Sequence, residues 1–108
     1  MKNKFITVQT TYPNLTSAKN LAKILLKEKL AACIQFSKIE SLYLWNEKIE
    51  NSKEILVNIK TKNSLYLELE KIIKKHHVYE NPQIISSKIN QGYSPYLYWI
   101  ESNLKNNK

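Results

Sequence analysis

The only two histidines of the chain, His76 and His77, are adjacent and are followed closely by Tyr79 and Glu80. Neutral imidazoles are common ligands for copper and zinc, and a carboxylate such as that of Glu80 could join them. Adjacent helical residues point about 100° apart, so both rings can share one ion only if the helix has already ended. The alternative is that both histidines cap a helix C-terminus or lie in solvent, where the helix dipole favours them. No cysteine cluster of a structural zinc site accompanies the pair.

The single cysteine, Cys33, lies in a stretch of alternating hydrophobicity and is expected to be a small buried residue rather than a nucleophile. A nucleophilic Cys–His pair is formally allowed, but no spacing supports it. One cysteine forms no intramolecular disulfide, and no apolar leader precedes the domain, so a cytoplasmic location is expected. No run approaches the roughly 20 apolar residues that cross a bilayer, and no membrane partner is expected.

Composition removes several kinds of site. The 108 residues carry 17 lysines and 9 glutamates, a formal charge of +8, and neither arginine nor aspartate is present. Bidentate guanidinium sites for phosphate or guanine are therefore excluded, and the single glycine, Gly92, excludes a glycine-rich phosphate loop. The positive charge indicates either a polyanion-binding surface or general enrichment in lysine. Nucleic acid is not expected beyond non-specific electrostatics, since residues 52–62 lack the glycine and stacking aromatics of an RNA-recognition strand.

Hydrophobic periodicity predicts the elements that must position these residues. Ala18, Leu21, Ala22 and Leu25 follow a helical period, whereas Ala32, Ile34 and Phe36 alternate as in a strand. The predicted strands are residues 5–11, 32–45, 52–62 and 84–89, and the predicted helices are 15–29, 64–75 and 94–104. This βαββαβ order with a C-terminal helix predicts an α+β fold, a ferredoxin-like two-layer sandwich with an antiparallel sheet and a long hairpin. One domain is expected over 1–108, with a core of about 5–104 and a frayed tail at 105–108.

A continuous apolar run interrupts the alternation expected for a sheet with one buried face. It consists of Leu42, Tyr43, Leu44 and Trp45. Both faces of the strand are therefore expected to be covered, either by the terminal helix of the same chain or by another copy of the chain. Aromatic residues of that terminal helix, with Trp99 among them, add area that also needs a partner.

Several motifs, in order and with matching spacing, resemble the CutA divalent-cation tolerance family over nearly the whole chain. They are Leu30–Ile34, Ser41–Trp45, Ile59–Thr61, His77–Pro82, and Gly92 with Tyr96–Ile100. The resemblance implies a ferredoxin-like subunit and a homotrimer similar to the PII signalling proteins. It also implies an interface through the hairpin and the terminal helix, which contain Leu42, Tyr43, Leu44, Trp45 and Trp99.

The resemblance further implies copper binding at His76 and His77, joined in the family by a thiol from the first strand. The matching position here is Thr10, and the loss of a soft ligand favours Cu(II) or Zn(II) over Cu(I). Two other positions depart from the family pattern. Val78 replaces a proline, which bears on the rigidity of the histidine loop, and Glu47 replaces a glycine, which predicts a differently shaped hairpin turn.

Two hypotheses follow. The first is a cytoplasmic homotrimer that binds divalent metal, copper above all, with a regulatory role like that of PII proteins. It is not an enzyme, because no nucleophile–base pair is visible, and it uses no organic cofactor. The alternative is a small-ligand or enzymatic site in the cleft between subunits. Its candidate residues are Lys60, Tyr79, Glu80, Tyr96 and Trp45.

Overall fold

Four strands and three α-helices make up the fold, which is α+β as predicted. The computed structural model describes residues 4–106. In chain order the elements are β1 (Phe5–Tyr12), α1 (Leu15–Lys27), β2 (Cys33–Trp45), β3 (Lys48–Lys62), a 3₁₀ turn (Asn63–Leu65), α2 (Tyr66–His76), β4 (Ile84–Lys88) and α3 (Ser94–Ser102). No helix within residues 4–106 is long and apolar enough to cross a membrane.

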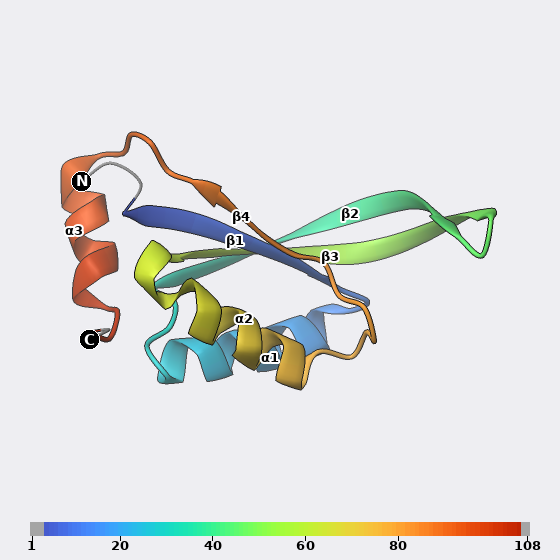
Figure 1. Ribbon diagram of the computed structural model, residues 1–108, viewed down its shortest axis with the longest axis horizontal. Helices are drawn as coiled ribbons and strands as arrows, with labels where there is room; N and C mark the ends of the chain where they lie inside the picture. Colours follow the sequence, from blue (N-terminus) through green and yellow to red (C-terminus); the bar gives the residue numbers. More distant parts are fainter. Residues whose placement is uncertain (1–3, 107–108) are drawn as a thin grey trace.

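The strands form one antiparallel sheet in the order β2-β3-β1-β4, which is the ferredoxin-like arrangement. Val8 of β1 lies opposite Ile59 of β3, and Ile59 lies opposite Ile34 of β2. Since side chains alternate along a strand, these residues share one face of the sheet, and Val8 and Ile59 are fully buried there. Helices α1 and α2 lie side by side beneath the sheet (Figure 1). The predicted stripe of α1 is confirmed, because its four apolar residues are all buried.

Helix α3 lies at the end of the sheet where β1 begins (Figure 1). Its Ile100 is buried in the core, and its Glu101 accepts a hydrogen bond from Lys62 at the end of β3. The chain stays attached beyond the helix, because the Lys105 N–H donates to the Lys29 carbonyl and the Lys105 ammonium pairs with Glu68. Lys105 therefore differs from the expected frayed tail, and the same expectation for positions 107 and 108 lies outside the described residues.

The β2–β3 hairpin extends well past the helix layer (Figure 1). Leu42 and Leu44 are 70% and 73% exposed, and Trp45 is 58% exposed. The terminal helix does not cover this run, because α3 packs at the opposite end of the sheet (Figure 1). The prediction that the terminal helix covers this run is therefore wrong, and among the described residues 4–106 the run stays exposed.

Two residues, Asn46 and Glu47, close the hairpin, since Trp45 pairs directly with Lys48. Both have left-handed backbones, with φ values of 50° and 65°. This is the pattern of a type I′ turn, in which glycine is favoured at the second position. The different turn shape expected from a glutamate at this position stays a prediction. Glu47 adopts the conformation that glycine prefers and therefore carries some backbone strain.

Candidate functional site

The imidazole of His77 lies between β1 and the loop that follows α2, and both of its nitrogens are engaged. Nδ1 accepts a hydrogen bond of 3.0 Å from the Tyr79 N–H. An accepting Nδ1 leaves the proton of the neutral ring on Nε2, which lies 3.1 Å from the Thr10 hydroxyl oxygen. These contacts assign the Nε2–H tautomer to His77, with Thr10 as the acceptor.

Aromatic rings surround the same side chain. Tyr12 stacks on it with 4.1 Å between centroids, and Tyr79 is tilted against it at 5.2 Å. Burial in this setting lowers the pKa of His77, and the nearby Lys74 acts in the same direction. The neutral imidazole is thus the form that this site stabilises.

His76 is placed differently, as the exposed last residue of α2. Its carbonyl accepts a hydrogen bond of 3.4 Å from the Tyr12 hydroxyl. The following residue, His77, is extended, with φ of −80° and ψ of 144°, so the helix ends between the two histidines. This is the condition under which adjacent rings can turn toward one ion.

The donor set for a metal is nevertheless small. Among residues 4–106, no three histidine, cysteine or acidic side chains gather into a group that could hold an ion. Glu80 is exposed, and its described contact is made by its carbonyl, which accepts from the Lys74 ammonium at 2.9 Å. A metal bound at this histidine pair would therefore have two imidazole ligands, and His77 would first have to give up its bond to Thr10 or to the Tyr79 N–H.

A broad groove of about 1080 Å³ separates the projecting hairpin from the loop at 78–83. Three of the predicted cleft residues line it, namely Trp45, Tyr79 and Glu80. The Tyr79 hydroxyl donates to Glu54 of β3 at 2.8 Å. Burial raises the pKa of Tyr79, and the hydrogen bond to Glu54 raises it further. The phenol therefore remains a proton donor at the wall of the groove.

The other two predicted cleft residues, Lys60 and Tyr96, form a separate group beside α3. The Lys60 ammonium lies 5.7 Å from the Tyr96 ring centroid and donates to Gln35 at 3.1 Å. Glu54 and Lys60 share one face of β3 but are six residues apart, which in a strand is about 20 Å. Within one chain the five candidates therefore divide into two groups at opposite ends of the sheet.

Cys33 belongs to the second group, because it pairs with Lys60 across the sheet. It is partly exposed rather than buried as expected, since its face of the sheet is the one turned away from the helix layer. Burial and a hydrogen bond with Cys33 raise the pKa of Tyr96. Thr10, the partner of His77, lies opposite Val57, three positions from Lys60 and hence on the other face. A Cys33–His77 nucleophilic pair is not formed.

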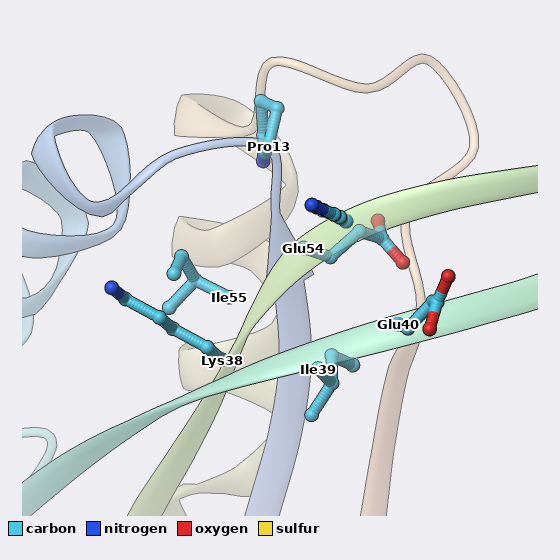
Figure 2. A pocket seen from close by; sticks show the side chains of 7 residues that line it. Pro13, Lys38, Ile39, Glu40, Glu54 and Ile55 are labelled. Atoms are coloured by element: carbon cyan, nitrogen blue, oxygen red, sulfur yellow. The ribbon is translucent and has the colours of Figure 1, made fainter.

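A smaller hollow of about 350 Å³ lies where the hairpin leaves the body of the domain (Figure 2). Ile39, Ile55 and Pro13 supply its apolar surface. Figure 2 shows the Lys38 ammonium and the Glu40 carboxylate pointing to opposite sides of it. With both signs of charge on its rim, the hollow favours neither anions nor cations.

The periodicity and motifs of the sequence did not place Tyr12 in the histidine site, and Thr10 was placed there only through the family resemblance. Tyr12 and Thr10 hold the His77 ring but are more than sixty positions away in the chain. Glu54 of β3 was not among the predicted site residues, and its carboxylate accepts the hydrogen bond of the Tyr79 hydroxyl. The alternation of β1 was a usable signal for Thr10 and Tyr12, because it places both on the same face as the buried Val8.

Comparisons with known proteins agree with this fold. The family model described as CutA1 divalent ion tolerance protein matches residues 6–103. The divalent-cation tolerance protein CutA of Pyrococcus horikoshii is 39% identical over 95 residues, covering 88% of this chain and 93% of its own length. A chloroplastic CutA of Arabidopsis thaliana is 37% identical over 102 residues, covering 94% of this chain. The crystal structure of CutA1 from Oryza sativa superimposes with a TM-score of 0.93 at 36% identity, covering 98% of both chains. This chain spans 51% to 60% of the length of its mouse, Arabidopsis and Xenopus relatives.

Proposed function

Because this chain belongs to the CutA1 divalent ion tolerance family, we propose that it is a cytoplasmic homotrimer that binds divalent metal, Cu(II) above all, through His76 and His77. The family is named for ion tolerance rather than for a reaction, and we assign no catalysis to the chain. A regulatory role like that of PII proteins belongs to the same proposal. The compartment is proposed for this chain alone, since the Arabidopsis relative is named chloroplastic.

The observation that carries the metal proposal is the end of α2 between the two histidines. The exposed His76 offers the first imidazole, and His77 becomes the second when its ring leaves Thr10. Imidazole nitrogen suits Cu(II) and Zn(II), and water can fill the remaining positions of an open site. A bound ion would link the exposed His76 ring to the His77 ring, which Tyr12 and Tyr79 contact.

Equilibrium titration with Cu(II) tests the site. His76→Ala and His77→Ala should each weaken binding at least about tenfold, because each removes one of two imidazole ligands. Lys75→Ala is the matched control, since it is an exposed residue of the same helix turn and supplies no ligand. Equal affinity in all three variants would refute the site.

Restoring a thiol at position 10 is a second test. In a tetrahedral site with metal–sulfur and metal–nitrogen distances of about 2.3 and 2.0 Å, the two ligand atoms are about 3.5 Å apart. The 3.1 Å between the Thr10 oxygen and His77 Nε2 is close to this value. Thr10→Cys should therefore raise Cu(I) affinity by about tenfold or more, measured by competition with a chromophoric chelator. Thr11→Cys, on the other face of the same strand, should not do so, and an equal gain there would contradict the assigned geometry.

Two features support the homotrimer. Strand β2 is an edge strand of 13 residues, and a long uncovered edge invites pairing with another chain. The hairpin also exposes apolar side chains on both faces, with Leu42 and Leu44 on one and Tyr43 and Trp45 on the other. Trp99 of α3, stacked on Tyr96 and 45% exposed, adds to the surface that a neighbouring copy would cover.

Sedimentation equilibrium tests the assembly. The wild type should sediment as three chains, and Leu44→Glu should dissociate it, because a charge would be placed in an apolar contact. Leu67→Glu is the control, since Leu67 is similarly exposed, at 77%, but lies on α2 away from the hairpin. A wild type that is a folded monomer at micromolar concentration would refute the trimer.

A second candidate function, a small-ligand or catalytic site between subunits, is favoured by the Tyr79–Glu54 hydrogen bond at the groove. The group of Lys60 and Tyr96 lies about 20 Å away along β3 and does not join it within one chain. A head-to-tail contact between copies would be needed to bring the two groups together. A crystal structure of the assembly decides the matter: Lys60 of one copy beside Glu54 of the next supports the site, and solvent between them contradicts it.

A further inference from the structure

The outer side of the helix layer carries a surface of lysines, which we call the helix-layer lysine surface. The buried residues of α1 and α2 point to the sheet, so their lysines point away from it. On α1 the lysines recur every four positions, and on α2 they occupy the C-terminal half. The members are Lys19, Lys23, Lys27, Lys71, Lys74 and Lys75, and all six are exposed.

Within residues 4–106, no acidic side chain forms a recorded ion pair with a lysine of this surface. The ion pairs recorded within residues 4–106 join Lys4 and Lys62 to Glu101 and Lys105 to Glu68, and none uses a lysine of α1 or α2. The helices run in opposite directions, so the lysine-rich end of α2 lies beside the start of α1 (Figure 1). The positive charges of the two helices therefore add over one continuous area.

Two leucines lie within the same area. Leu26 of α1 is 44% exposed and Leu67 of α2 is 77% exposed. A single exposed leucine is ordinary, but lysines interspersed with exposed leucines on a helical surface are typical of helices that lie in a membrane interface. Lysine supplies attraction to anionic headgroups, and leucine can enter the boundary with the acyl chains.

We propose that the helix-layer lysine surface docks on anionic lipid bilayers, with the helices lying flat on the headgroups. Nucleic acid fits the surface less well, because the chain has no arginine and the only Phe, Tyr or Trp in α1 and α2, Tyr66, donates its hydroxyl to Glu70. This proposal departs from the expectation of no membrane partner. That expectation rested on the lack of a spanning segment, which does not bear on a surface contact.

Co-sedimentation with vesicles tests the proposal, using phosphatidylcholine with and without phosphatidylserine at low salt. The test variant carries Lys19→Gln, Lys23→Gln and Lys71→Gln. The matched control carries Lys38→Gln, Lys53→Gln and Lys88→Gln, which are exposed strand residues. Both variants lower the formal charge from +8 to +5, since each loses three lysines. Each lysine near an anionic leaflet raises the affinity for the membrane by about a factor of five. The test variant should therefore bind the vesicles about a hundredfold more weakly than the wild type, and the control variant should lose much less affinity.

Docking is supported if three results are found together. Binding should require phosphatidylserine, it should be lost when salt is added, and Leu67→Gln should bind more weakly than the wild type. Circular dichroism of each variant checks that the fold is intact. Equal losses in the test and control variants would overturn the proposal, since net charge alone would then explain the binding. No binding to phosphatidylserine vesicles at low salt would also overturn it. Tighter binding to a DNA oligonucleotide than to vesicles, lost in the test variant, would overturn it in favour of nucleic acid.

Discussion

The partly buried ring of His77 predicts how the stability of the protein depends on pH. Burial lowers the pKa of His77 in the folded chain, whereas the unfolded chain takes up the proton near the ordinary value of about 6.5. Below about pH 6.5 the unfolded state therefore binds more protons, and the free energy of unfolding falls as pH falls. One group contributes a slope of at most about 1.4 kcal/mol per pH unit, and the slope ends where the folded imidazole itself is protonated. Above about pH 7.5 this residue should contribute no pH dependence.

The contacts of the His77 ring also determine how much stability is lost when the ring is removed. His77→Ala removes a hydrogen bond to Thr10, a hydrogen bond from the Tyr79 N–H and the stack on Tyr12. Each hydrogen bond contributes about 1 kcal/mol and the stack about 0.5–1.5 kcal/mol, so the variant should lose about 2–4 kcal/mol. His77→Gln should lose less, since its amide can replace part of the hydrogen bonding.

Urea unfolding at a fixed protein concentration, repeated between about pH 8 and about pH 5, measures both effects. His77→Gln should remove the slope near and below about pH 6.5, and His76→Gln should keep it, because the buried ring is then still present. Nitrogen-15 NMR of the two imidazoles adds an independent check, with the proton of neutral His77 expected on Nε2. An unchanged slope in His77→Gln, or a neutral ring protonated on Nδ1, would refute the reasoning.

Two stability predictions concern other contacts. Glu101→Gln should lower the free energy of unfolding in urea by about 1–3 kcal/mol, because it removes the carboxylate that faces the mostly buried Lys62. Glu68→Gln, in an exposed ion pair, should lower it by less than about 1 kcal/mol. Equal losses in the two variants would contradict the role given to burial. Glu47→Gly should raise the free energy of unfolding by about 0.5–1 kcal/mol, and with it the melting temperature, since glycine adopts the left-handed backbone at the hairpin turn without strain. Glu50→Gly, within β3, should instead lower the melting temperature, and the turn assignment fails if both glycines act alike.

Local patterns in the sequence were sufficient for the elements and their order. The spacing of Ala18 and Leu21 predicted the buried stripe of α1, and the alternation around Ile34 predicted β2, because each pattern depends on residues close in the chain. The left-handed backbone of Glu47 was not predicted, since propensity argues against a glutamate in that conformation and the pairing of two long strands overrides it.

The site was predictable only in part, for a physical reason. His76 and His77 were found because they are neighbours in sequence, but the bond of His77 to Thr10 and its stack on Tyr12 depend on β1, which only the folded sheet brings close. The cleft candidates failed to converge within one chain because Lys60 and Tyr79 belong to opposite ends of the same face. Residue types alone indicate which groups could act together, and only strand register tells which of them meet.

The position of β1 at the centre of the sheet has a consequence for how the chain folds. The hairpin of β2 and β3 can form from neighbouring residues. Strand β1, in contrast, completes its pairing only after β3 and β4 are both in place, and β4 lies near the end of the chain. Such long-range closure is slow compared with hairpin formation. The apolar tip of the hairpin would thus form before the sheet is complete, and refolding yield should fall as protein concentration rises.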